Sequence, residues 1–230
     1  MSKVAAIILA AGESMRMGQP KALLPWPSPS GTTTLLGHAV DSAIEAGYGP
    51  IVVVLGHDAE RLRAELAHGI ERASTSSART VESTSGVARP ELFEGRAAVR
   101  VVVNERYREG RATSIVTGAQ ALVQELDGVL VSSVDQPRSV AMLRLLHDAW
   151  FAASPRPMVA APAYDGLAGH PVLVDASLVD ALLSISEERQ GLREVVHRHW
   201  ATRLLVPTDD PQCLTNVNTP EDYERALALA

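Results

Sequence analysis

Val4-Ala-Ala-Ile-Ile-Leu9 is a continuously apolar run that ends at the small residues Ala10-Ala11-Gly12. A run of this length without a polar residue is typical of a strand that is buried on both faces, and a small-residue turn lets such a strand leave its sheet. Burial on both faces occurs mainly in parallel sheets that carry helices on each side. This opening segment therefore predicts the first strand of an α/β fold.

The segments that follow alternate between helical and strand patterns. Residues 34–46 carry apolar side chains at helical spacing up to Gly47, and residues 51–55 form a second apolar run. Residues 59–66 repeat the helical pattern after a turn at Gly56. The order strand, helix, strand, helix predicts a parallel sheet joined by right-handed crossovers.

The rest of the chain predicts further elements of both kinds. Strands are expected at 99–103, 129–134, 158–161, 171–174 and 204–207, and helices at 113–126, 142–151, 178–183, 192–198 and from Pro220 onward. Thr113 or Ser114 is expected near the N-cap of the first of these helices, and Thr219 at the N-cap of the last. Residues 68–98 are rich in Ser, Thr, Arg, Glu and Gly, and they are expected to form an irregular excursion.

The composition limits the number of domains and the classes of partner. With 230 residues, 46% of them hydrophobic, the chain can bury one substantial core, so one domain over residues 1–230 is expected. The formal net charge of -6 argues against a nucleic acid or an anionic membrane as the main partner, because both require basic surfaces. The one cysteine, Cys213, excludes an intrachain disulfide and a multi-thiolate metal site, and it fits a reducing, cytoplasmic location. No apolar stretch approaches the length of a membrane span.

The loop after the first strand combines small residues with two cations. It reads Leu9-Ala-Ala-Gly-Glu-Ser-Met-Arg16-Met-Gly-Gln-Pro-Lys21, and Lys21 is one of only two lysines in the chain. Small residues let backbone N–H groups approach an anion, and Arg16 and Lys21 can neutralise a polyphosphate. The spacing matches neither a Walker loop nor a dinucleotide fingerprint. A phosphate-binding loop is predicted, the alternative being a glycine turn with solvated charges.

A second motif places a carboxylate at the end of a buried strand. The run Val129-Leu-Val-Ser-Ser-Val134 is followed by Asp135-Gln-Pro137. Ligands in open α/β folds gather at the carboxyl ends of strands, where a single Asp can contact Mg²⁺ bound to phosphates. A helix N-cap or turn role for Asp135 is the alternative. Because both motifs follow strands of one parallel sheet, they are expected to meet at the same edge.

Taken together, the motifs resemble those of a known family. The chain is similar to the MobA-like nucleotidyltransferase domain, and within it to the molybdenum cofactor cytidylyltransferases. The segments that carry the resemblance are Leu9-Ala-Ala-Gly12 with Ser14, Arg16, Met17, Gly18, Pro20 and Lys21; Glu109-Gly110 with Ser114 and Gly118; Asp135-Gln-Pro137; Gly169-His-Pro171; and Asn216-Val-Asn-Thr-Pro-Glu-Asp222. Residues 68–98 look longer than the family requires.

The resemblance implies an α/β, Rossmann-like fold of the glycosyltransferase-A type with a mostly parallel central sheet. It also implies an Mg²⁺-dependent reaction in which a substrate phosphate attacks the α-phosphorus of a nucleoside triphosphate and releases pyrophosphate. The expected substrates are CTP and a molybdopterin-type phosphate, and the expected protein partner is a molybdoenzyme contacted transiently. Such a transfer needs positioning and charge neutralisation rather than a nucleophilic side chain.

The resemblance further implies roles for individual residues. The nucleotide site would be formed by Leu9, Ala10, Ala11, Gly12, Arg16, Lys21 and Ser114, and the acceptor site by Gly169, His170, Pro171 and Arg193. Arg16, Lys21 and Asp135 would be the catalytic residues, with Asp135 on Mg²⁺. Many relatives carry acids where this chain has Asn216-Val-Asn218, so an amide, Asn218 or alternatively Asn216, is expected to supply the second metal contact. For Asn218, shaping the turn before Thr219 is the alternative role.

Several alternatives stay open at this point. Within the enzyme class, the chain could be a guanylyltransferase acting on the same cofactor or a transferase acting on another small phosphate. From a different class, it could be a nucleotide-binding or cofactor-binding module without catalysis, because the segment Asn216-Val-Asn218 carries asparagines where many relatives carry acids. His57 and Asp58 follow the second strand, where they either approach the acceptor or cap the next helix. The oligomeric state is left open.

Overall fold

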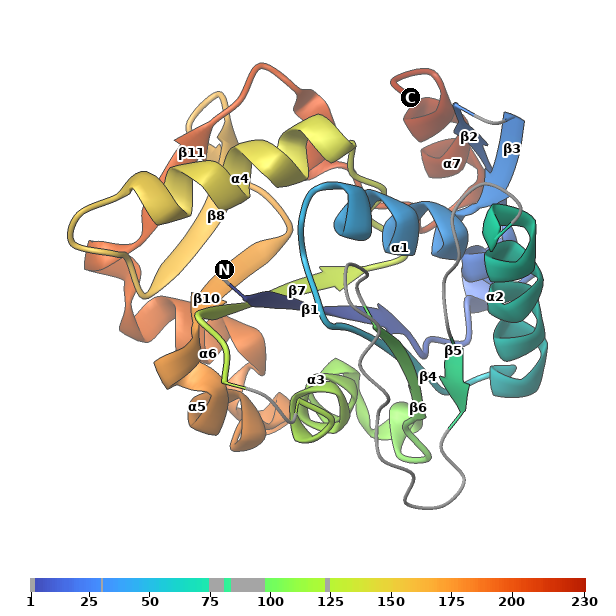
Figure 1. Ribbon diagram of the computed structural model, residues 1–230, viewed down its shortest axis with the longest axis horizontal. Helices are drawn as coiled ribbons and strands as arrows, with labels where there is room; N and C mark the ends of the chain where they lie inside the picture. Colours follow the sequence, from blue (N-terminus) through green and yellow to red (C-terminus); the bar gives the residue numbers. More distant parts are fainter. Residues whose placement is uncertain (1–2, 30, 75–80, 84–97, 123–124) are drawn as a thin grey trace.

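One main sheet runs through the molecule. The computed structural model describes residues 3–29, 31–74, 81–83, 98–122 and 125–230 (Figure 1). The strand order is β11-β8-β10-β7-β1-β4-β6-β5, with β9 paired to β8. These strands are β1 (Val4–Ala10), β4 (Ile51–Leu55), β5 (Val81–Ser83), β6 (Val99–Val103), β7 (Gly128–Ser133), β8 (Val159–Tyr164), β9 (Leu167–Ala168), β10 (Val172–Asp175) and β11 (Leu204–Pro207).

Most neighbouring strands of this sheet are parallel. β1 lies between β7 and β4 and is parallel to both, and β6 and β5 continue the sheet in the same direction. Within the described chain, antiparallel pairing in this sheet is confined to β10 and the short β9. The prediction of an α/β fold with a mostly parallel central sheet is therefore confirmed.

Helices cover both faces of the sheet (Figure 1). On one face lie α1 (Leu35–Glu45), α2 (Ala59–Ser74) and α4 (Val140–Ala152). On the other face lie α3 (Arg111–Gln120), α5 (Val179–Leu183) and α6 (Leu192–Arg198). None of the helices in the described ranges is both long enough and apolar enough to span a membrane.

Strand β1 shows why a central strand of this sheet is a continuous apolar run in the sequence. Ala6 and Ile8 belong to the core under α1, α2 and α4, whereas Ile7 and Leu9 belong to the core under α3, α5 and α6. Helix α3 can approach β1 closely because it presents Gly118, where an added Cβ would come within 2.5 Å of the Ile7 Cγ2 atom. Both faces of the strand are thus packed, and neither face accepts a polar side chain.

Four predicted elements have the predicted bounds, and the others differ, helix α3 at both of its ends. β4, β6, β11 and α6 begin and end as predicted. Helix α3, expected over 113–126, begins at Arg111 and ends at Gln120, and its N-cap is Gly110 rather than Thr113 or Ser114. Gly110 has a φ of 117°, which residues with a side chain avoid, and the Thr113 hydroxyl donates to the Gly110 carbonyl instead of capping an N–H group.

A small hairpin that was not predicted from the sequence lies between the loop after β1 and helix α1. β2 (Pro25–Ser28) pairs antiparallel with β3 (Gly31–Thr34) in a separate two-stranded sheet. Two prolines in β2 conceal it, because proline is depleted in strands except at edges. Its Trp26 packs with Val217 and with α7 (Pro220–Leu227), which begins at the predicted Thr219 N-cap. The hairpin therefore supports the segment that contains Asn218.

The expected irregular excursion over residues 68–98 contains regular structure. Helix α2, expected to end at Leu66, continues to Ser74, and β5 adds a parallel strand beside β6. Gly69 is unfavourable within a helix, and the Ser- and Thr-rich sequence that follows α2 favours turns, so neither element shows a clear local pattern. Residues 75–80 and 84–97 lie outside the described residues, so the expectation for them stays a prediction.

Lowering the pH from 7.5 to 4.5 is expected to destabilise the fold through His38. Burial lowers the pKa of His38 from 6.5 to about 4 against a smaller raising effect of a backbone hydrogen bond at Arg138. The unfolded chain then binds the proton first, so stability falls as the pH drops below about 6.5, by about 2.5 kcal/mol at pH 4.5. Urea unfolding at both pH values measures the total loss, to which His170, whose pKa burial also lowers to about 4, contributes, so the share of His38 is the difference from a His38 variant.

The control for this prediction is His38→Gln. Glutamine stays neutral in this pH range and can still hydrogen-bond Ser42, which the His38 ring contacts at 3.4 Å. The variant should therefore lose about 2.5 kcal/mol less stability than the wild type between the two pH values. Equal losses in the two proteins would contradict the prediction.

Candidate active site

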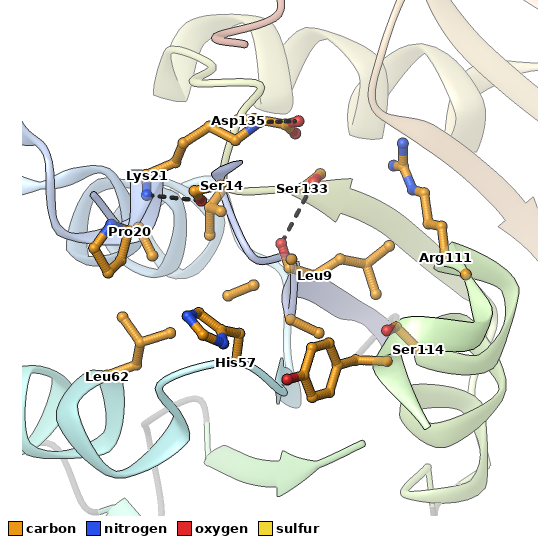
Figure 2. A pocket seen from close by; sticks show the side chains of 17 residues that line it. Leu9, Ser14, Pro20, Lys21, His57, Leu62, Arg111, Ser114, Ser133 and Asp135 are labelled. Carbon is orange, nitrogen blue, oxygen red and sulfur yellow. Dashed lines mark hydrogen bonds and ion pairs between the residues drawn. The ribbon is translucent and has the colours of Figure 1, made fainter. Parts of the chain in front are cut away.

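A cavity of about 220 Å³ lies at the carboxyl ends of β1, β4, β6 and β7 (Figure 2). This is the sheet edge at which parallel α/β folds bind their ligands. The lining residues come from the loops that follow these strands and from the start of α3: Leu9, Ala10, Ala11, Gly12, Ser14, Lys21, His57, Tyr107, Gly110, Arg111, Ser114, Ser133 and Asp135 among others. Leu9, Ala10, Ala11, Gly12, Lys21 and Ser114, all predicted to line a nucleotide site, are thus brought together.

The loop after β1 leaves room for a ligand and turns Lys21 back toward the sheet. A Cβ added to Gly12 would meet no atom within 4 Å, so the backbone is open at this position. Ser14 adopts a left-handed conformation with a φ of 55°, which is uncommon for a residue with a side chain. Its hydroxyl accepts a hydrogen bond of 3.0 Å from the Lys21 backbone N–H group. Ser14 thus holds the two ends of the loop together.

Lys21 joins the two motifs that the sequence analysis singled out. Its ammonium group lies 3.3 Å from Asp135 Oδ2 and donates a 3.0 Å hydrogen bond to Asn218 Oδ1. The Lys21 side chain is only 16% exposed. Because β1 and β7 are adjacent and parallel, the loops that follow them meet as predicted.

Asp135 is a charged carboxylate, and one of its two oxygens has no hydrogen-bond partner among the described residues. Burial favours its neutral form, but Lys21, the Ser133 hydroxyl and Arg111 outweigh this effect and lower the pKa of Asp135 below its usual value. Its Oδ1 atom is buried and has no hydrogen-bond partner among the described residues. An ionised carboxylate with a free oxygen, next to the amide oxygen of Asn218, fits the oxygen donors that Mg²⁺ and Mn²⁺ prefer.

Few side chains in the described ranges could bind a metal ion at this site. No group of three or more His, Cys, Asp and Glu side chains in them is arranged to hold a metal ion. Mg²⁺ is commonly held by one or two protein oxygens together with water and substrate phosphates. The arrangement of Asp135 and Asn218 therefore fits a metal that is shared with a nucleotide.

Backbone and side-chain contacts hold the segment 216–218 against the end of β7. The Val217 N–H group donates to the Asp135 carbonyl at 2.7 Å, and Gln136 Nε2 donates to Asn216 Oδ1 at 2.7 Å. Both amide oxygens accept a hydrogen bond: that of Asn216 accepts from Gln136, and that of Asn218 accepts from Lys21, which also pairs with Asp135. Of the two asparagines, the geometry favours Asn218 as the metal contact.

Arg138 holds three loops of the site together, and no sequence motif predicts this role. Its buried guanidinium donates to the backbone carbonyls of His170 at 2.8 Å, Cys213 at 3.1 Å and Thr215 at 3.0 Å. Burial lowers the pKa of Arg138 to about 10, so it remains charged at neutral pH. All these acceptors are carbonyl groups far away along the chain, and no local pattern marks such a contact.

Ser114 is fixed by a residue from the neighbouring strand. The amide of Asn104, which follows β6, donates to Ser114 Oγ at 2.9 Å and to Thr113 Oγ1 at 2.8 Å. Ser114 is therefore a buried wall residue rather than the expected helix cap. His57 and Tyr107 complete this side of the cavity, with ring centroids 6.2 Å apart.

A second cavity, of about 400 Å³, adjoins the first on the side of α6. Three of the residues predicted for an acceptor site line it, namely Gly169, His170 and Arg193, while Pro171 is buried and does not. Burial, followed by the charges of Arg111 and Arg138, lowers the pKa of His170 to about 4, so its ring is neutral at physiological pH. Apolar side chains form much of the wall, and Arg111, Arg193 and Arg203 add positive charge.

Arg16 is the one predicted nucleotide contact that lies outside both cavities. It sits in a short 3-10 helix, Met15–Met17, and is exposed. Neither cavity is lined by it. Its contact with a triphosphate therefore stays a prediction.

Known proteins resemble this chain in sequence over most of its length. Residues 6–203 match the model of the MobA-like NTP transferase domain. The molybdenum cofactor cytidylyltransferase of Escherichia coli (strain K12) is 22% identical over 226 residues, which are 97% of this chain and 95% of that protein.

Solved structures share the fold over nearly the whole chain. Rv0371c from Mycobacterium tuberculosis H37Rv is 25% identical with a TM-score of 0.69 and 99% of both chains covered. A structure of Rv0371c in complex with manganese is 23% identical, with a TM-score of 0.66 and coverage of 99% and 98%. A nucleotidyl transferase from Methanothermobacter thermautotroptrophicus is 22% identical, with a TM-score of 0.71 and coverage of 99% and 97%.

Proposed function

Because the chain belongs to the MobA-like NTP transferase family and is a nucleotidyltransferase, we propose that it transfers CMP from CTP to a phosphate of a molybdopterin-type acceptor. The observation that carries the proposal is the pair of adjoining cavities, the first with Lys21 and Asp135 in its wall and the second with cationic and apolar walls. Two substrates that must react with each other need adjacent sites of this kind. The choice of CTP follows the name of the Escherichia coli relative.

The proposed reaction is one displacement at phosphorus. An oxygen of the acceptor phosphate forms a bond to the α-phosphorus of CTP, and the bond from that phosphorus to the oxygen bridging to the β-phosphorus breaks. The bridging oxygen keeps the electron pair and leaves as part of pyrophosphate. The acceptor phosphate is already ionised near pH 7, so the protein's task is to align the groups and offset their charge.

Residues of the first cavity can perform this task. The open backbone at Gly12 admits the phosphates, and the Lys21 ammonium offsets their negative charge from a largely buried position. A divalent cation, when bound by Asp135 and Asn218, would neutralise charge on the triphosphate and on the leaving pyrophosphate. We propose Mg²⁺ for this position, since Mg²⁺ binds readily through few protein oxygens and substrate phosphates. Arg16 would reach the triphosphate from the exposed loop.

The second cavity supports an acceptor that is both flat and anionic. Trp200 lines it with its ring centroid 3.2 Å from the Arg203 guanidinium carbon, while Ile115 and Val196 add apolar surface. Aromatic and guanidinium planes bind flat heterocycles, and Arg193 can pair with a phosphate. A phosphorylated pterin combines these two features.

We place this reaction in the cytoplasm, where the product would pass to a molybdoenzyme through transient contact. The support is the free thiol of Cys213, which is buried and is compatible with a reducing compartment.

The test is to follow pyrophosphate release with each of the four nucleoside triphosphates, Mg²⁺ and a molybdopterin acceptor. CTP is expected to react at least about tenfold faster than GTP, because a polar base-binding site rejects the wrong hydrogen-bonding pattern. Chelation of the metal should abolish release, and added Mg²⁺ should restore it. Omission of the acceptor is the control.

Each other result identifies an alternative. Faster release with GTP would make the protein a guanylyltransferase. Release with a different small phosphate but not with molybdopterin would change the acceptor. Nucleotide binding without any turnover would leave a binding module.

A further inference from the structure

Arg111 stands at the boundary between the two cavities. It is the first residue of α3, and it lines both the nucleotide cavity and the second cavity. Figure 2 shows its side chain extending from α3, away from Ser114, toward the level of Asp135. The exposed guanidinium group is therefore placed where a phosphate from one cavity would meet a phosphate from the other.

Arg111 differs from the two buried cations near this boundary, because its side-chain donors are uncommitted among the described residues. Lys21 is held by Asp135 and Asn218, and Arg138 is held by backbone carbonyls. No hydrogen bond or ion pair joins the Arg111 side chain to any residue in the described ranges. Its donors are therefore free for a ligand.

The helix end beneath Arg111 is already capped. The carboxylate of Glu187 accepts a hydrogen bond from the Ala112 N–H group in the first turn of α3. Glu187 also packs over Gly110, so closely that a Cβ there would lie 2.3 Å from Glu187 Cγ. An anion arriving at this boundary would thus meet the guanidinium of Arg111 rather than the Ala112 N–H group.

We propose that Arg111 is a catalytic residue, which binds the α-phosphate of the nucleotide while the acceptor phosphate attacks it. The inference rests on the proposed function. During the displacement, negative charge of two phosphate groups is brought to one point, and a planar guanidinium can donate to oxygens of both. An interaction that strengthens as the two groups approach lowers the barrier rather than the dissociation constant of either substrate.

The test compares Arg111→Gln and Arg111→Lys with the wild type. Arg111→Gln should lower kcat about 50-fold, while the Kd for CTP, measured by calorimetry without acceptor, changes less than about threefold. Arg111→Lys keeps the charge but loses the fork of donors, so it should recover about a fifth of the wild-type kcat. Because the side chain is exposed and makes no contact that holds the fold, the melting temperatures should agree with that of the wild type.

The matched control is Arg144→Gln, which removes the same charge from α4. Arg144 is exposed and donates to the carbonyl of Glu45, outside both cavities. This variant should keep the wild-type kcat.

Three results would overturn the proposal. An active wild type with an equally active Arg111→Gln variant would refute the role of Arg111 alone. A rise in the KM for the acceptor at unchanged kcat would show that Arg111 only binds the acceptor. A wild-type protein that is inactive with every nucleotide and acceptor would refute the proposed function, and this inference with it.

Discussion

Asp135→Asn is expected to lower kcat about 10³-fold while leaving the fold intact. The substitution keeps the size of the side chain but removes the charge that faces Lys21 at 3.3 Å. It also replaces the buried carboxylate that is proposed to bind the metal, whose Oδ1 atom has no hydrogen-bond partner among the described residues. Losing one preorganised charged group in a site that handles phosphate charge typically costs a factor of 10² to 10³, and a weakened metal site adds to this.

Two measurements separate this effect from a loss of structure. Asp148→Asn removes a carboxylate from the exposed surface of α4, where Asp148 pairs with His147, and should change kcat less than about twofold. The Mg²⁺ concentration for half-maximal rate should rise at least about tenfold in Asp135→Asn and stay constant in the control. An unchanged Mg²⁺ requirement would show that Asp135 is not a metal ligand.

Lys21→Met is expected to lower kcat/KM for CTP about 300-fold. The ammonium group is the largely buried cation of the nucleotide cavity, where its charge acts with little screening by water. Methionine keeps the length of the side chain and removes the charge. Because the loss is one of interaction with the triphosphate, binding of CTP should weaken more than binding of CMP.

The chain provides a matched control in its only other lysine. Lys3 is exposed and its backbone N–H group, rather than its ammonium group, pairs with Asp127. Lys3→Met should therefore react like the wild type. Arg16→Met tests the exposed arginine, for which a loss of about threefold to tenfold is expected. Equal weakening of CTP and CMP binding by Lys21→Met would contradict the assigned role.

Much of the fold could be predicted from local patterns. The apolar run at 51–55 gave strand bounds that agree with the structure, because a strand buried on both faces excludes polar residues. The bounds at 99–103 agree as well, although Arg100 interrupts the run of valines there. The hairpin at Pro25–Ser28 and Gly31–Thr34 was missed, because its prolines and threonines do not show the apolar pattern of a buried strand. Its stability comes from packing of Trp26 against α7, which is almost 200 positions further along the sequence.

The candidate site was predicted only in part, because local motifs mark some of its residues and not others. Lys21 and Asp135 belong to short motifs at the ends of adjacent parallel strands, so their meeting follows from the strand order. Arg138 and Arg111 belong to no such motif. Arg138 acts through carbonyl groups of loops that converge only in the folded chain, and Arg111 is distinguished by lying between two cavities.

The sequence by itself determined the α/β class, the position of the phosphate-binding loop and the carboxylate that faces it. These properties depend on the pattern of apolar residues along single strands and on small residues at the strand ends. Both features are local, so they can be predicted from the sequence. Only the tertiary structure decided which polar atoms remain free: Asn216 is occupied by Gln136, while Asp135 Oδ1 has no described partner. Whether such an acceptor atom is free or occupied depends on contacts between distant segments, which a single stretch of sequence does not contain.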